Sequence, residues 1–419
     1  MIEKLKVFIA DVAPTCCRGE DLEDRLLELE NLVNTYGGIV ILKKVQKRGI
    51  PDYNTYIGSG KIDEIIEEMK SEGASVLIMG NILKPLQIYN LNEKLREHKI
   101  TAWDRIDLIL KIFERHANSP EAKLQIELAS IKHMGPRIFG MGMILSRQGL
   151  SRGKGETNTE IMKRHLREAE LNIRKDLDKY AHVRAEHRKS RVRKNLQTVG
   201  IVGYTNAGKS SLMNLLTKKG VLSEDKLFAT LGTDVGKMII APNPPYPSNF
   251  ENSPHPNPLP RREGTEQIEQ DISPRPLGEG SGVRAAIENG DFLEGIDYSY
   301  QKPKEVLVND TIGFIRDLPP NLIDAFSSTL EDSIEADLLL HVIDASDPKI
   351  ADKIKVVEDI LAKINANQKR LYVFNKIDLI DEAKKVELTE KFKDLNPIFI
   401  STYDKIGIED LKQIIGKHI

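Results

Sequence analysis

One short segment, residues 203–210 with the sequence G-Y-T-N-A-G-K-S, constrains the fold of this chain more than any other. Its glycines, lysine and serine have the spacing of a phosphate-binding loop. The apolar residues 199–202 before it are typical of a buried parallel strand, and residues 211–216 after it are typical of a helix. Such a loop presents backbone N–H groups and the positive end of a helix to a phosphate. The segment therefore predicts an α/β domain that binds a nucleoside triphosphate. The loop residues are Gly203, Tyr204, Thr205, Asn206, Ala207, Gly208, Lys209 and Ser210.

Two side chains of this loop have defined roles in nucleotide chemistry. Lys209 can reach the β- and γ-phosphate oxygens, and the Ser210 hydroxyl is a ligand for Mg²⁺. ATPases, nucleotide kinases and GTPases all use such a pair. The loop alone therefore leaves these three classes open.

A second motif indicates which base is bound. Asn375, Lys376, Ile377 and Asp378 form an N-K-x-D segment directly after the apolar residues 371–374. A carboxylate there accepts hydrogen bonds from guanine N1–H and the exocyclic amine, whereas adenine would leave it unpaired. The motif favours GTP and GDP over ATP, and the alternative interpretation is a charged turn after a strand.

Ser401 and Thr402 follow another strand-like run, residues 397–400, where GTPases usually have Ser-Ala and present a backbone N–H to the guanine oxygen. Thr402 departs from that pattern. We therefore include both residues in the nucleotide site, with the contact from Thr402 as the less typical one.

A third motif, between the other two, predicts a sensor of the γ-phosphate. Asp310, Thr311, Ile312 and Gly313 form a D-x-x-G segment after the strand-like residues 305–308. Asp310 would hold Mg²⁺ through water, and the Gly313 N–H would contact the γ-phosphate and release it after hydrolysis. A tight turn is the alternative. Phe314 stands where Ras-type enzymes have the glutamine that orients the attacking water, so we expect slow intrinsic hydrolysis and leave the catalytic group unassigned.

Together these motifs resemble the HflX family of ribosome-associated GTPases. The resemblance includes residues 227–231 and 310–319, and it extends to N-terminal segments at 46–48, 51–52, 56–61, 107–110, 123–129 and 145–149. It covers the chain apart from one insertion. It implies a cytoplasmic protein that binds the large (50S) ribosomal subunit in its GTP state and splits stalled ribosomes under heat or other stress.

The resemblance also assigns the first switch to Phe228, Ala229, Thr230 and Leu231. Thr230 would join Ser210 as a ligand of Mg²⁺. The family usually continues with D-P-T-T-R, whereas this chain has G-T-D-V-G-K at 232–237, so Thr233 is a rival for the metal.

Composition is consistent with this assignment but does not discriminate. The 419 residues include 61 basic and 63 acidic side chains, for a net charge of −2, and 40% are hydrophobic. That content suffices for two or three globular domains. No apolar run reaches the roughly 18 residues of a membrane span, and the first ten residues alternate like a strand rather than a signal peptide. We expect a soluble, cytoplasmic monomer, and Cys16 and Cys17 are too few for a disulfide framework or a metal cage.

Three parts are predicted along the chain. Residues 1–117 alternate strand and helix patterns, which indicates a small α/β domain. Within it, residues 58–61 (G-S-G-K) open a helix. Relatives have been proposed to bind ATP through this domain, so an ATP site and a simple helix-starting turn both stay open. Residues 195–419 form the GTPase domain, a mostly parallel sheet with helices on both faces.

The middle part, residues 118–194, predicts an antiparallel hairpin of two long helices, 120–145 and 158–194. One stripe of the second helix, from Met162 to Tyr180, is apolar and predicts packing against the first helix. Residues 163–194 contain twelve Lys or Arg and five Asp or Glu, a local charge of +7. Such density favours nucleic acid, with solvation of an exposed helix as the alternative. With the resemblance, the partner becomes ribosomal RNA, and the hairpin tip would lie near the peptidyl transferase centre, although the family's glycine-rich loop is shortened here. The predicted RNA-binding residues are Arg147, Gln148, Arg152, Lys154, Arg188, Lys189, Arg191, Arg193 and Lys194.

Residues 241–304 interrupt the GTPase domain. They hold eleven of the twenty prolines without apolar periodicity. We expect a disordered insertion at the tip of a hairpin between residues 238–240 and 305–307, with a proline-rich ligand for a binding module as the alternative.

The leading hypothesis is a GTP-dependent switch on the ribosome. The main rival is an RNA-binding assembly module whose nucleotide site only stabilises the fold. A phosphate-loop enzyme that modifies a small molecule or tRNA would need an added catalytic group, and we find no cluster of Cys, His or carboxylates to supply one.

Overall fold

The computed structural model describes residues 4–17, 19–117, 119–147, 158–217, 234–240, 303–311, 313–316, 322 and 335–419. Residues 1–240 and 304–419 form one compact unit, and residues 241–303 form another.

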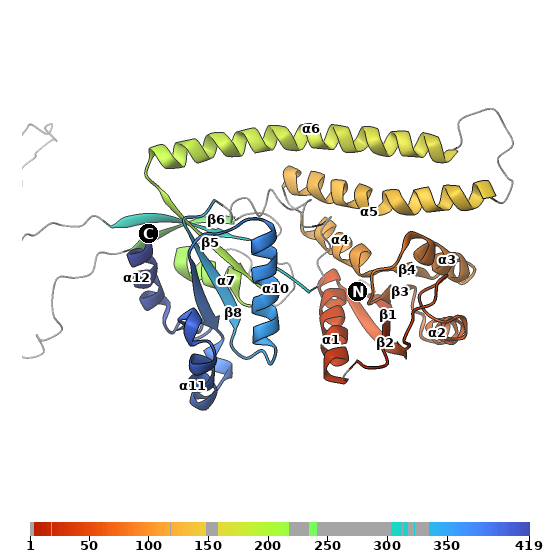
Figure 1. The fold of residues 1–419 in the computed structure, drawn as a ribbon, viewed down its shortest axis with the longest axis horizontal. Coiled ribbons are helices and arrows are strands. Elements are labelled where there is room, and N and C mark those ends of the chain that lie inside the picture. Colours follow the sequence, from red (N-terminus) through yellow and green to blue (C-terminus); the bar gives the residue numbers. More distant parts are fainter. Residues whose placement is uncertain are drawn as a thin grey trace, which may run out of the picture. The chain divides into compact units, whose positions relative to one another are not determined.

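The N-terminal part is a four-stranded parallel sheet in the order β2-β1-β3-β4, with helices on both faces (Figure 1). Side chains of β1 alternate between two cores: Val7 and Ile9 pack against α1 and α4, and Phe8 and Ala10 pack against α2 and α3. Because helices cover both faces of the sheet, β1 is buried continuously from Val7 to Ala13, in place of the one-sided burial that an alternating pattern would give. The strands are β1 (Leu5–Ala13), β2 (Gly38–Lys47), β3 (Val76–Met79) and β4 (Thr101–Trp103), and the helices are α1 (Gly19–Tyr36), α2 (Ser59–Glu72), α3 (Pro85–Arg96) and α4 (Arg105–His116).

Two long helices follow, α5 (Pro120–Arg147) and α6 (Asn158–Arg193), and they pack against each other as the expected hairpin (Figure 1). Ile173 of the predicted stripe is buried, whereas Met162 at its start is half exposed. The second half of α5 is tied to the start of α4 by buried ion pairs. Arg137 donates to Asp104 at 2.6 Å and to Asp107 at 2.8 Å, and Asp104 also caps α4 through the Asp107 N–H.

The GTPase part is a six-stranded sheet in the order β10-β9-β8-β5-β7-β6, in which only the β6–β7 pair is antiparallel. Helices α7 and α12 bury one face, and α10 and α11 bury the other. The predicted α/β fold is confirmed. The strands are β5 (Gln197–Gly203), β6 (Asp234–Ile240), β7 (Lys304–Asp310), β8 (Leu338–Asp344), β9 (Arg370–Asn375) and β10 (Ile398–Phe399), and the helices are α7 (Lys209–Thr217), α10 (Ile350–Lys363), α11 (Glu382–Lys391) and α12 (Ile408–His418).

The hairpin expected around the insertion is present. Ile240 pairs with Lys304 and Met238 pairs with Val306 in antiparallel register. The insertion itself, residues 241–302, lies outside the described residues, as do its predicted disorder and proline motifs. Within the described ranges no helix is both long and apolar enough to cross a membrane.

Candidate guanine nucleotide site

The carboxyl ends of the parallel strands β5, β7, β8 and β9 bring the three motifs to one edge of the sheet, where α/β sheets bind ligands. Two glycines of the phosphate loop are required there by geometry. Gly203 has φ 154°, and a Cβ on it would lie 2.3 Å from the Val342 carbonyl oxygen. Gly208 has φ 91°, and a Cβ on it would lie 2.2 Å from Asn375 Nδ2. Any side chain at either position would therefore clash with a neighbouring strand or loop.

Lys209 begins α7 and lies almost entirely inside the site. Its Nζ donates to the Tyr204 carbonyl at 2.8 Å. Burial lowers the pKa of Lys209 from the ordinary 10.5 to about 8, an effect that the Asp310 carboxylate opposes. A bound triphosphate would favour the protonated form of this lysine and raise its pKa again.

Oxygen ligands suited to Mg²⁺ lie beside this lysine. Ser210 Oγ donates to Asp310 Oδ2 at 2.7 Å, and Asp310 is fully buried at the end of β7. Thr205 Oγ1 is buried and has no hydrogen-bond partner among the described residues. A hard cation with oxygen ligands fits this set, and Ser210 and Asp310 would hold it. The third predicted ligand, Thr230, lies outside the described residues with Phe228, Ala229, Leu231 and the rival Thr233.

The predicted γ-phosphate sensor packs directly on the phosphate loop. A Cβ on Gly313 would lie 2.7 Å from Thr205 Cγ2 and 2.8 Å from Lys209 Nζ, so only glycine fits there. The Phe314 N–H donates to the Gly203 carbonyl at 3.1 Å, and the Phe314 carbonyl accepts from the Thr205 N–H at 2.8 Å. The Phe314 side chain is 1% exposed. It is held in the core with Val202 and Leu339.

The structure describes Thr311, another residue of this motif, but not Ile312. The Thr311 hydroxyl donates to the Ile201 carbonyl at 2.7 Å, which ties the motif to β5. Ile312 lies outside the described residues.

The base-reading motif is braced against the phosphate loop by Asn375. Its Nδ2 donates to the Ala207 carbonyl at 2.9 Å, and its Oδ1 accepts from the Thr402 N–H at 3.0 Å. The Ser401 hydroxyl donates to Asp378 Oδ1 at 2.6 Å, which orients the carboxylate predicted to bind guanine. The structure therefore brings the base and phosphate segments together through one buried amide.

Lys376 and Ile377 complete this loop. Lys376 has φ 64°, and its Nζ contacts Asp344 Oδ2 at 2.7 Å. The Ile377 N–H donates to the Ile400 carbonyl at 3.3 Å. Sequence reasoning missed Asp344, although it ends the apolar run of β8 at the same sheet edge.

Comparison with known proteins decides the family. Three family models match in succession: GTP-binding GTPase N-terminal at residues 23–114, GTP-binding GTPase Middle Region at 116–191, and 50S ribosome-binding GTPase at 198–250. GTPase HflX of Caldanaerobacter subterraneus is 35% identical over 401 residues, which cover 95% of this chain and 77% of that protein. The chain belongs to the HflX family of GTPases. The resemblance inferred from the motifs is confirmed, and the chain is a GTP-hydrolysing enzyme that binds GTP and GDP.

A second HflX relative and a solved structure also match most of the chain. GTPase HflX of Escherichia coli K12 is 33% identical over 406 residues, which cover 96% of this chain and 80% of that protein. A solved structure, described as the crystal structure of SsGBP and GDP complex, superposes with a TM-score of 0.51 at 25% identity, covering 99% of this chain and 98% of that one.

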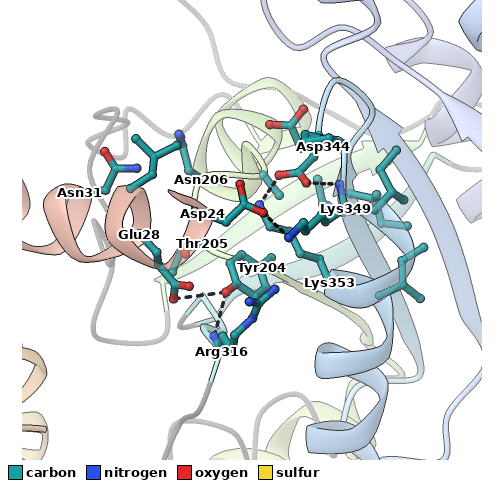
Figure 2. A pocket seen from close by; sticks show the side chains of 18 of the residues that line it. Asp24, Glu28, Asn31, Tyr204, Thr205, Asn206, Arg316, Asp344, Lys349 and Lys353 are labelled. Carbon is teal, nitrogen blue, oxygen red and sulfur yellow. Dashed lines mark hydrogen bonds and ion pairs between the residues drawn. The ribbon is translucent and has the colours of Figure 1, made fainter. Parts of the chain in front are cut away.

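This HflX-family chain has a polar network beside the phosphate loop that the sequence did not reveal. Figure 2 shows the Tyr204 hydroxyl between Glu28 of α1 and Arg316. It borders a cavity of about 500 Å³. Glu28 lies 176 residues from Tyr204, so no local pattern could have linked them.

The predicted RNA-binding residues that are described lie on or just after α6. Arg188 pairs with Glu335 at 2.8 Å and Lys189 with Glu186 at 2.9 Å, while Arg193 and Lys194 are exposed and Arg191 is half-buried. Arg147 ends α5, and its side chain is outside the described part. Gln148, Arg152 and Lys154 are outside it entirely.

Proposed function

We propose that this HflX-family GTPase is a GTP-controlled switch that binds the 50S subunit or the 70S ribosome and splits or rescues stalled ribosomes. One observation carries the proposal. A guanine nucleotide site braced by Asn375 occurs in the same chain as a helix with a charge of +7 over residues 163–194. The match of residues 198–250 to the 50S ribosome-binding GTPase model supports the choice of partner.

Slow basal hydrolysis is part of the proposal. Phe314 has no group that could orient a water molecule, and its side chain is buried in the core around Val202 and Leu339. Activation would then come from the ribosome, which makes nucleotide turnover a consequence of docking.

The metal and nucleotide assignments follow from the site. Mg²⁺ would be held by Ser210 and Asp310, the latter through water, with Thr230 as the proposed third ligand; the ion would neutralise charge on the phosphates. ATP binding at residues 58–61 has weaker support. The Gly58 N–H donates to Gln46 Oε1 at 2.9 Å and Lys61 Nζ donates to Glu64 at 2.7 Å, so both groups are engaged within the protein.

Three functional parts are proposed: an α/β domain at 1–117, a helical hairpin at 118–194 and a GTPase domain at 195–419. Ribosomal RNA would contact the hairpin through the basic residues predicted from the sequence. Among those described, Lys189, Arg193 and Lys194 are exposed, and Arg193 and Lys194 form no ion pair within the described residues. We further propose that the protein acts as a monomer in the cytoplasm, where its partner is found.

The experiment is GTP turnover with and without purified 50S subunits, with Lys209→Ala as the inactive control. Subunits should raise the turnover of the wild-type protein, and Arg193→Glu/Lys194→Glu should weaken that stimulation while leaving basal turnover unchanged. The matched control Lys391→Glu/Lys393→Glu changes the same charge on the GTPase domain and should keep the stimulation. Turnover that stays at its basal rate with 50S subunits would favour the assembly-module alternative and contradict this proposal.

A further inference from the structure

Hydrogen bonds hold the backbone of the segment that follows Gly313, at Phe314 and at Arg316. The Phe314 N–H and carbonyl pair with Gly203 and Thr205. The Arg316 N–H donates to the Tyr204 hydroxyl at 2.8 Å, and the Arg316 carbonyl accepts from Arg105 Nη2 at 3.1 Å. This segment, residues 314–316, is where a GTPase must rearrange when the γ-phosphate is bound or lost.

The two groups that hold Arg316 meet at the Glu28 carboxylate, and Figure 2 shows the link from Arg316 through Tyr204 to Glu28. The Tyr204 hydroxyl donates to Glu28 Oε1 at 3.3 Å, and Arg105 Nη2 donates to the same oxygen at 2.7 Å. Arg105 is 4% exposed and Tyr204 is 8% exposed. Charge-assisted hydrogen bonds are stronger than neutral ones, so the short bond from Arg105 to Glu28 anchors this closed network. The bond from Tyr204 to Glu28, at 3.3 Å, is its longest link, and the network as a whole restrains the segment.

Apolar burial adds to the restraint. Ile315 is fully buried in the core that contains Ile106 and Ile109 of α4, whereas Phe314 is buried in the core of the GTPase part. Consecutive side chains are thus buried on opposite sides. Moving the segment would expose both of them to water.

The restraint bears on the chemistry because of what the segment presents. The side chains of Phe314 and Ile315 are apolar and buried, and both backbone groups of Arg316 are bonded away from Lys209 and Gly313. In this arrangement the backbone groups of Phe314 and Arg316 are engaged within the protein, and the polar side chain of the segment is Arg316, which lines the cavity beside the phosphate loop. Hydrolysis aided by this segment would first require its release from Tyr204 and Arg105.

We propose that Tyr204 is a positioning residue for GTP hydrolysis, whose hydroxyl fastens residues 314–316 to Glu28 and thereby restrains turnover. The restraint supplies a physical cause for the slow basal rate on which this inference rests. The phosphate loop would then both bind the nucleotide and hold back the segment that senses it. Loss of the Tyr204 hydroxyl or of the Glu28 carboxylate would loosen the hold on residues 314–316.

The test is basal GTP turnover of Tyr204→Phe without ribosomes. Loss of one hydroxyl from a hydrogen-bonded network should raise kcat about three- to tenfold, with KM for GTP within about twofold. Tyr372→Phe is the matched control, because the Tyr372 hydroxyl also donates to a glutamate, Glu358, at 3.2 Å but lies outside the network. It should leave kcat unchanged.

A second variant guards against a folding defect. Glu28→Gln should also raise kcat, and the double variant should exceed the larger single effect by little, because both act through one network. Thermal melting is measured in parallel, because a variant that is merely destabilised would have a lower melting temperature without a higher kcat. A kcat equal to or below wild type in both single variants overturns the inference. A fast basal rate in the wild-type protein would instead contradict the proposed slow switch.

Discussion

Raising the pH from about 7 to about 9 should weaken GDP binding through loss of the proton from Lys209. Burial holds the pKa of this lysine at about 8 in the nucleotide-free protein, whereas two or three phosphate charges favour its protonated form. The bound protein therefore keeps the proton that the free protein loses. Affinity is fully present below about pH 8 and declines as the pH rises through that value, because binding must then take up a proton.

The magnitude follows from the titration. With a pKa near 8, roughly nine-tenths of the free protein carries the proton at about pH 7 and roughly one-tenth at about pH 9. The dissociation constant for GDP should increase about tenfold over that interval, which corresponds to about 1.4 kcal/mol.

Isothermal titration calorimetry in two buffers of different ionisation enthalpy measures both the affinity and the protons taken up. Lys209→Met should bind more weakly and show no comparable pH dependence. Titration of the guanine base affects wild type and variant alike, so their difference isolates Lys209. If wild type and Lys209→Met have the same slope, with equal proton uptake, Lys209 does not titrate in this range and the reasoning from its burial is wrong.

Three further predictions concern other parts of the site. Asn375→Ala removes the partner of the buried Ala207 carbonyl and of the part-buried Thr402 N–H. The unpaired carbonyl costs about 1–3 kcal/mol, so the free energy of unfolding in urea and the GDP affinity should both fall. Asn172→Ala on the exposed side of α6 should change neither, and an unchanged urea midpoint for Asn375→Ala would contradict the bracing role. Asp378→Asn should weaken GDP binding about a hundredfold or more and favour xanthosine diphosphate in competition assays, since two hydrogen bonds to a carboxylate are lost; a retained preference for GDP would refute guanine reading by this residue. Joining Ile240 to Lys304 by an Asn-Gly turn in place of residues 241–303 should keep GDP affinity within about twofold, because these two residues already pair; loss of binding would show that the insertion is needed.

The parts of the site that could be predicted are those encoded in contiguous residues. The phosphate loop, the D-x-x-G segment and the N-K-x-D segment each follow an apolar strand, and parallel strands deliver such segments to one edge. The hairpin from Met238 to Val306 was likewise predictable across the insertion, because apolar runs flank it on both sides. These features depend on local backbone geometry, which short sequences specify well.

The remainder depends on contacts between distant residues. Strand β4 has three residues and α4 follows it directly, so neither was separated by pattern alone, although the segment was included in the N-terminal domain. Strand β8 and helix α10 were also not identified in advance. Glu28 lies on α1 and Arg105 begins α4, and both helices have the sequence pattern of an ordinary amphipathic helix. Their pairing with Tyr204 and Arg316 arises from tertiary packing, which periodicity does not report.

The ion pairs between the second half of α5 and the start of α4 have a mechanical consequence. Arg137 of α5 grips Asp104, and Asp104 is joined by one peptide bond to Arg105, which holds the Arg316 carbonyl. The residue that anchors α5 is therefore adjacent to the residue that contacts the GTPase part at Arg316. A force on the two long helices would be transmitted to the segment after Gly313 through Asp104 and Arg105.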